Sequence, residues 1–123
     1  MKLRFRGNTL RLRVNQREVM ALAEGNALQE QIIFPGENGL SYVLETCAEP
    51  AGKASFQQGT IRVSAPSKQV RDWADSSTNV GIYFDLAANG SVLKVAIEKD
   101  LECVDGPEDE RDPEAFPREL KSC

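Results

Sequence analysis

The sequence contains no histidine, and its three cysteines, Cys47, Cys103 and Cys123, form no C-x-x-C pair. These absences exclude a Ser-His-Asp triad, a histidine-based zinc site and a histidine general base. No run of about 18 apolar residues occurs, which excludes a transmembrane helix. The first residues also lack the apolar region and cleavage site of a secretory signal. We therefore expect a cytoplasmic protein with reduced thiols and no membrane contact.

The charge of the chain is unevenly distributed. The chain has 123 residues, of which 41% are hydrophobic and 28% charged, and its formal net charge is −4. This length and composition are typical of one globular domain with a buried core. Residues 1–17 carry six cations and no acid, whereas residues 101–123 carry eight acids and three cations. We predict one domain over residues 1–104 and an acidic, proline-containing tail over residues 105–123, so a basic site can lie on the folded domain.

Period-two alternation and turn residues predict strands near residues 2–6, 9–14, 28–34, 40–46, 54–56, 60–65, 80–87 and 91–98. Asn15 and Glu18 have the spacing of a capping box and predict a helix over residues 17–24. Pro66-Ser67 predicts the start of a second helix, which ends at Asp75. The predicted fold class is α+β, with a mainly antiparallel sheet or open barrel of about eight strands and two short helices.

The order of these elements, ββαββ followed by ββαββ, suggests an internal repeat. An offset of 51 residues gives eight identities, among them Phe5 with Phe56 and Arg11 with Arg62, against about three expected by chance at typical residue frequencies. The strand near residues 28–34 falls one residue out of step at this offset with the strand near residues 80–87. We predict a duplication with pseudo-repeats 1–50 and 51–101, the alternative being two halves that merely share turn chemistry.

The candidate site is a cationic strand face. Alternation places the cations of the first two strands on one face, the repeat adds one arginine and the last strand adds one lysine. Arginine presents a planar fork suited to phosphate or carboxylate. The predicted anion-binding residues are Lys2, Arg4, Arg6, Arg11, Arg13, Arg62 and Lys94. In the alternative interpretation, Glu45, Asp85 and Glu98 pair with these cations on a solvated face.

No catalytic residue, metal site or cofactor is predicted. A nucleophilic cysteine needs a neighbouring base, and the acids of the tail lack the spacing of an EF-hand loop. Nucleic acid is not an expected partner, because the net charge is negative and the sequence offers few aromatic residues for an exposed binding face. The chain could form a homo-oligomer.

The segments FRGNTLRLRV, NQREVMALAEG and IEKDLECVD, with AFP in the acidic stretch, resemble a small uncharacterised bacterial family of short β-rich proteins. Its members share an R-G-N-[S/T] hairpin and an E-K-D-x-x-C end, and the resemblance implies a fold without an activity. The predicted architecture is also similar to the triphosphate-tunnel (CYTH-like) fold, whose enzymes line a barrel with Lys, Arg and Glu and use a divalent metal. Their first strand carries E-x-E-x-K, where this chain has Lys2-x-Arg4-x-Arg6.

Three functions are therefore compared. The residues favour non-enzymatic binding of a small phosphorylated or carboxylated ligand on the cationic face. The first alternative is a tunnel-type, metal-dependent phosphohydrolase in which Glu45, Asp85 and Glu98 hold Mg²⁺. The second alternative is a protein-interaction module whose acidic tail binds a basic partner.

Overall fold

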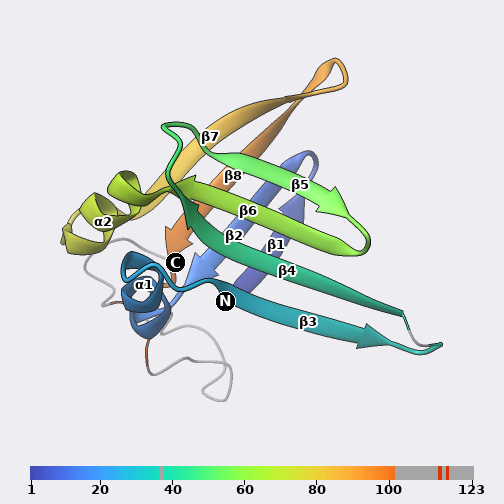
Figure 1. The fold of residues 1–123 in the computed structure, drawn as a ribbon, viewed down its shortest axis with the longest axis horizontal. Helices are drawn as coiled ribbons and strands as arrows, with labels where there is room; N and C mark the ends of the chain where they lie inside the picture. Colours follow the sequence, from blue (N-terminus) through green and yellow to red (C-terminus); the bar gives the residue numbers. More distant parts are fainter. Residues whose placement is uncertain (37, 102–113, 115, 117–123) are drawn as a thin grey trace.

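The computed structural model describes residues 1–36, 38–101, 114 and 116, which form eight strands and two helices (Figure 1). In chain order these elements are β1 (Lys2–Arg6), β2 (Thr9–Val14), α1 (Gln16–Ala23), β3 (Leu28–Phe34), β4 (Asn38–Cys47), β5 (Lys53–Gln57), β6 (Thr60–Pro66), α2 (Ser67–Asp75), β7 (Gly81–Ala88) and β8 (Ser91–Lys99). The predicted α+β class is confirmed. In these residues no helix is long and apolar enough to cross a membrane.

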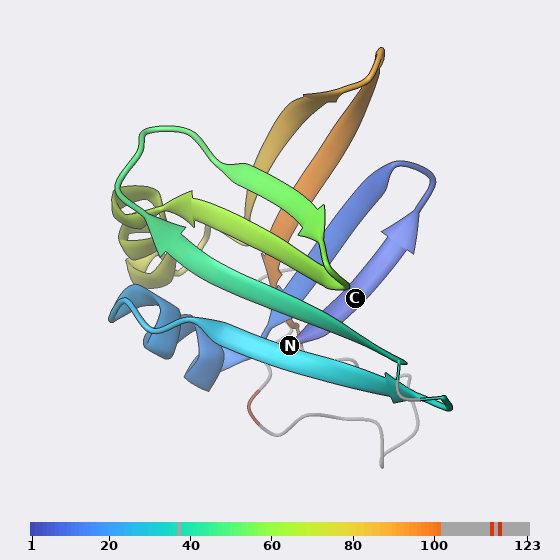
Figure 2. The ribbon, with the colours of Figure 1, turned by 45° about the vertical axis from the view of Figure 1, so that its right-hand side comes forward.

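The strands divide between two mixed sheets. Sheet A has the order β1-β2-β8-β7, and sheet B has the order β3-β4-β6-β5. The two central strands of each sheet are parallel, and each edge strand is antiparallel to its neighbour. The eight strands therefore form two separate sheets and do not close into a barrel. Figure 2 shows sheet B in front of sheet A, with both helices at the same end of the molecule.

Local sequence accounts for the ends of the elements. The side chain of Asn15 accepts a hydrogen bond from the Glu18 N–H at 2.9 Å, and the Glu18 carboxylate accepts one from the Asn15 N–H at 2.9 Å. This reciprocal pair is the predicted capping box at the start of α1. Between β7 and β8, Asn89 and Gly90 have positive φ angles of 47° and 81°, as a type I′ turn requires.

One hydrophobic core lies between the inner faces of the sheets and the two helices. Residues of both sheets and both helices belong to one buried cluster: Leu10, Leu12, Val14, Val19, Leu22, Tyr42, Leu44, Val63, Ala65, Val70, Trp73, Ile82, Val95 and Ile97. Trp73 of α2 is fully buried, and its Nε1–H donates to the carbonyl of Val80 at 3.0 Å. The core thus fixes which face of each sheet points outward.

The register relates the two halves of the chain. The hairpins β1–β2 and β5–β6 have the same register at an offset of 51 residues, since Lys2 pairs with Arg13 and Lys53 with Ser64. The offset becomes 54 residues between β3 and β7 and 53 residues between β4 and β8, because the connection after α2 is longer and the β7–β8 turn is shorter. These changes remove the one-residue mismatch found at a constant offset. A common origin of the two halves stays a prediction.

The predicted tail lies outside the described residues apart from Glu114 and Phe116, as do Cys103 and Cys123. Phe116 packs against the core, and its N–H donates to the carbonyl of Asp100 at 2.7 Å. The carbonyl of Glu114 accepts from the Gln16 N–H at 2.8 Å. These two residues of the tail therefore contact the folded domain.

Candidate anion-binding face

Six of the seven predicted cations lie together on the outer face of sheet A, which we call the cationic face. Its residues are Lys2, Arg4, Arg6, Arg11, Arg13 and Lys94. Arg4 lies opposite Arg11 in the β1–β2 register. Thr9 of β2 lies opposite Arg6 of β1 on one side and opposite Lys94 of β8 on the other. Residues paired in this way point to the same side of a sheet. The structure therefore brings these six cations to one surface.

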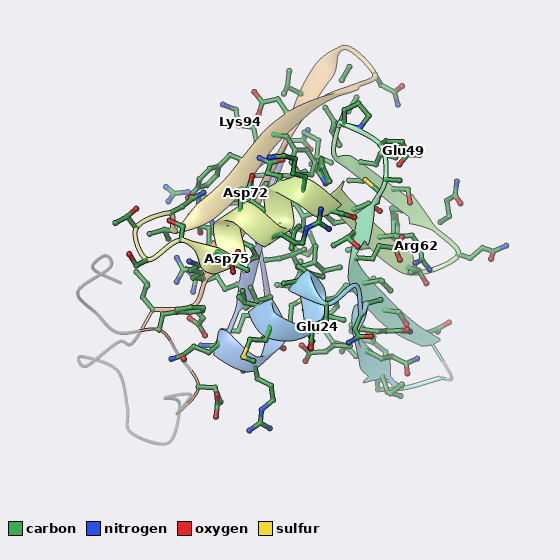
Figure 3. The ribbon with its side chains drawn as sticks, turned by 60° about the vertical axis from the view of Figure 1, so that its left-hand side comes forward. Glu24, Glu49, Arg62, Asp72, Asp75 and Lys94 are labelled. Atoms are coloured by element: carbon green, nitrogen blue, oxygen red, sulfur yellow. The ribbon has the colours of Figure 1, made fainter. Side chains whose placement is uncertain are left out.

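The seventh predicted cation, Arg62, lies on the other sheet. It belongs to β6, and its Nη1 is 2.8 Å from Oε1 of Glu45 on the outer face of sheet B. Figure 3 shows Arg62 and Lys94 on different sheets. Arg62 therefore does not join the cationic face, and neither does the carboxylate of Glu45.

Glu98 pairs with two arginines of the cationic face. Its Oε1 lies 3.2 Å from Nε of Arg11 and 3.8 Å from Nε of Arg13, and the Glu98 side chain is only 15% exposed. The Nε–H of Arg11 nevertheless makes no hydrogen bond within the described residues, so the 3.2 Å contact is an ion pair without hydrogen-bond alignment. The buried Nε of Arg11 is therefore held against Glu98 by charge alone.

Tyr83 also contacts Glu98, and this contact contributes to the raised pKa of the Tyr83 phenol. The Tyr83 hydroxyl donates to Oε2 of Glu98 at 2.7 Å. Burial, together with this hydrogen bond and the charge of Glu98, raises the pKa of Tyr83 to about 12, although Arg11 and Arg13 lower it. The phenol is thus held in its protonated form by the same carboxylate that pairs with the arginines.

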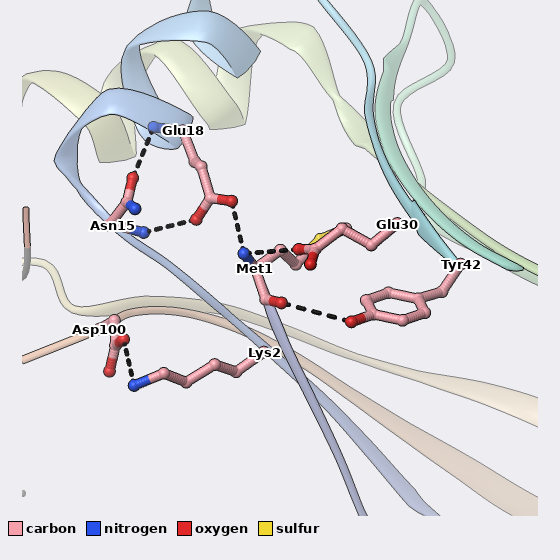
Figure 4. A network of polar contacts seen from close by, with 7 residues as sticks. All are labelled: Met1, Lys2, Asn15, Glu18, Glu30, Tyr42 and Asp100. Atoms are coloured by element: carbon pink, nitrogen blue, oxygen red, sulfur yellow. Dashed lines mark hydrogen bonds and ion pairs between the residues drawn. The ribbon is translucent and has the colours of Figure 1, made fainter. Parts of the chain in front are cut away.

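The start of β1 is held by a polar network (Figure 4). The ammonium group of Met1 lies 2.5 Å from Glu18 and 2.7 Å from Glu30, and Nζ of Lys2 lies 2.8 Å from the largely buried Asp100. Burial alone lowers the pKa of the Met1 ammonium, but the two carboxylates outweigh it and raise this pKa. The network therefore connects the start of β1 to α1, to β3 and to the residue that follows β8.

Within the described residues Arg4, Arg6 and Lys94 form no ion pair, whereas Lys2, Arg11 and Arg13 each pair with an acid. Together with Thr9 and Arg11, Arg4 and Arg6 line a hollow of about 200 Å³. Like charges that face each other across a strand pair repel, and an anion between them relieves the repulsion. The guanidinium groups can each offer two parallel N–H donors to a phosphate or carboxylate.

A second hollow, which the sequence did not predict, lies between the two sheets at the β1–β2 hairpin. This apolar cleft has a volume of about 490 Å³ and is lined by Phe5, Gly7, Asn8, Thr9, Leu10, Leu40, Ala54, Ser55, Phe56, Ile61 and Leu93. Phe5 and Phe56 remain 58% and 67% exposed. In the sequence, the only indication of this cleft is that Phe5 and Phe56 match at the 51-residue offset. Such a match is equally expected for two residues of the core.

The structure does not confirm the similarity to the triphosphate-tunnel fold. The cationic face points outward and the space between the sheets is apolar, whereas a charged tunnel needs its cations inside a barrel. Within residues 1–36 and 38–101, together with Glu114 and Phe116, no group of three or more Cys, Asp or Glu side chains could hold a metal ion.

Fold and site together define an α+β protein of two mixed four-stranded sheets with one cationic outer face. The chain belongs to the DUF7009 family, a family of unknown function, whose model matches residues 1–120. This agrees with the expected membership of an uncharacterised family. Comparison with curated proteins and with solved structures found no match.

Proposed function

We propose that the protein binds a small phosphorylated or carboxylated ligand without transforming it, and that Arg4, Arg6 and Arg11 hold the anionic group. The observation that carries this proposal is the hollow lined by Arg11 together with Arg4 and Arg6, the two arginines of β1 that form no ion pair within the described residues. Bidentate contacts from several guanidinium groups are a common way to recognise a phosphate. We further propose a cytoplasmic location, which the free thiol of Cys47 supports.

Sheet B supports the proposal because its β5–β6 hairpin forms with neutral residues at the positions that correspond to Arg4 and Arg6. At the offsets given above, Arg4 corresponds to Ser55 and Arg6 to Gln57. Both are neutral, yet the β5–β6 hairpin has the same register as the β1–β2 hairpin. The two arginines are therefore available for a ligand.

Calorimetric titration with inorganic phosphate at low salt tests the proposal. Replacing Arg4→Gln or Arg6→Gln should weaken phosphate binding by about 1–3 kcal/mol, since each change removes a charge-assisted hydrogen-bond donor. Arg62→Gln is the matched control, because Arg62 is an outward arginine on the other sheet. Unchanged affinity in both Arg4→Gln and Arg6→Gln would refute the anion site.

A further inference from the structure

The apolar cleft has the size and lining of a ligand site. Its volume of about 490 Å³ falls within the range of roughly 300–1,000 Å³ that is typical of small-molecule sites. Phe5 of β1 and Phe56 of β5 contribute to its lining from sheets A and B, respectively. Both phenyl rings remain more than half exposed. The core therefore leaves apolar surface that a ligand can cover.

The cleft and the cationic hollow meet at one residue. Thr9 contributes to both, and it begins β2 directly after the Gly7-Asn8 turn. On β1, Phe5 lies between Arg4 and Arg6 in sequence and on the opposite side of the strand. β1 is the edge strand of sheet A. Phe5, which lines the cleft, and Arg4 and Arg6, which line the cationic hollow, therefore lie on opposite faces of the same edge strand.

The turn at this end leaves room for a connection between the two hollows. Gly7 has no side chain, and the space around the position of its missing Cβ is open to 4 Å. Asn8 donates from Nδ2 to the carbonyl of Val92 at 2.8 Å, which fixes the hairpin against β8. A flexible molecule can therefore pass around this end of the hairpin from the cationic side to the apolar side.

We infer that the ligand is an amphipathic anion, with a phosphate or carboxylate head on Arg4, Arg6 and Arg11 and an apolar chain in the cleft. This inference rests on the proposed function, because it uses the same arginines for the head group. The cations at the rim favour an anionic occupant over a neutral one. The predominantly apolar residues that line the cleft favour a hydrocarbon chain, and each buried methylene should tighten binding by up to about fourfold.

Titration calorimetry with alkyl phosphates below their micelle concentrations tests the inference. Octyl phosphate should bind at least about tenfold more tightly than inorganic phosphate, and hexyl phosphate should lie between the two. Phe56→Ser should remove most of this gain and leave the affinity for inorganic phosphate unchanged, which also shows that the variant is folded. Ile33→Ser is the matched control, because Ile33 is a 70% exposed residue of β3 that lines neither hollow.

Each other result overturns the inference in a distinguishable way. If inorganic phosphate binds but the alkyl chain adds nothing, the inference fails and the proposed function stands. If neither compound binds, both fail. If octyl glucoside, which has no charge, binds as tightly as octyl phosphate, the cleft does not select an anion. If sedimentation shows a dimer that Phe56→Ser dissociates, the occupant of the cleft is a second copy of the chain.

Discussion

The outer faces of the two sheets have the same register and different chemistry. Two cations are shared, since Lys2 corresponds to Lys53 and Arg11 to Arg62. The acid that pairs with the shared arginine is also present in both sheets, as Glu98 and Glu45. The remaining cations of sheet A have neutral counterparts: Ser55 for Arg4, Gln57 for Arg6, Ser64 for Arg13 and Ser41 for Lys94.

This comparison separates the charges that belong to the fold from those that do not. An arginine–glutamate pair between the two central strands occurs in each sheet, so we assign it a role in the sheet itself. The additional arginines occur on sheet A alone, where they increase repulsion without acidic partners for Arg4 and Arg6. Such an arrangement is typical of a site that an anionic ligand completes.

The largest expected effect is a loss of stability when a core residue of either helix is truncated, since both helices pack against the common core. Trp73 of α2 and its counterpart Leu22 of α1 are fully buried, so alanine should cost about 3–5 kcal/mol at Trp73 and about 2–5 kcal/mol at Leu22. Trp73 should show the greater loss, because Nζ of Lys99 also lies 5.8 Å from the centre of its ring. Urea unfolding measures both values, and a loss below about 1 kcal/mol at either position would contradict the described core.

The second effect is measured on a variant in which two arginines of sheet A are replaced by the residues found at the corresponding positions of sheet B. The double variant Arg4→Ser/Arg6→Gln should lose about 2–4 kcal/mol of phosphate binding free energy. Its melting temperature should stay the same or rise slightly, since one member of the Arg4–Arg11 pair of like charges is removed. Phosphate titration and thermal unfolding measure the two results. A melting temperature lowered by several degrees would mean that the arginines stabilise the sheet instead.

A third, smaller effect compares the two acids. Glu98→Gln should raise phosphate affinity several-fold, because it removes the carboxylate that competes for Arg11 and Arg13. Glu45→Gln on sheet B should leave phosphate affinity unchanged. Glu45→Gln should lose less than about 1 kcal/mol of stability, as expected for a partly exposed ion pair. Equal effects of both variants on phosphate binding would remove the distinction between the sheets.

The smallest effect is spectroscopic and pH-dependent. In a Tyr42→Phe background, Tyr83 should ionise near pH 12, above its ordinary pKa of 10.0. Because the folded protein favours the protonated phenol, this stabilising contribution is complete below about pH 10 and is lost as the pH rises towards 12. Glu98→Gln should lower the pKa, since Arg11 and Arg13 then act on the phenol without the opposing charge. Tyrosinate absorbance measures both values, and an unchanged pKa in the variant would contradict the Tyr83–Glu98 contact.

Local patterns predicted most elements, and long-range pairing was not predictable in the same way. The capping box of Asn15 and Glu18 and the Asn89-Gly90 turn depend on neighbouring residues, so the sequence revealed both. The parallel pairing of β2 with β8 joins Thr9 to Lys94, and such pairing leaves no local signal. The division into two sheets was missed for this reason.

The site shows the same limit. Strand alternation correctly predicted that Arg4, Arg6 and Arg11 share a face. The repeat was read as adding Arg62 to that face, but a repeat relates equivalent positions and does not make them adjacent. The cleft was missed because Phe5 and Phe56 have the alternation of core residues, although both side chains are more than half exposed in the structure.

The most direct test of the account follows phosphate binding by NMR on the unmodified protein. Backbone amide and arginine side-chain signals would be recorded during a phosphate titration at low salt. We predict saturable shifts at Arg4, Arg6, Thr9 and Arg11, and none at their counterparts Ser55, Gln57, Thr60 and Arg62. Equal shifts on both sheets, or the absence of saturable shifts on sheet A, would contradict the central claim that the additional arginines form an anion site.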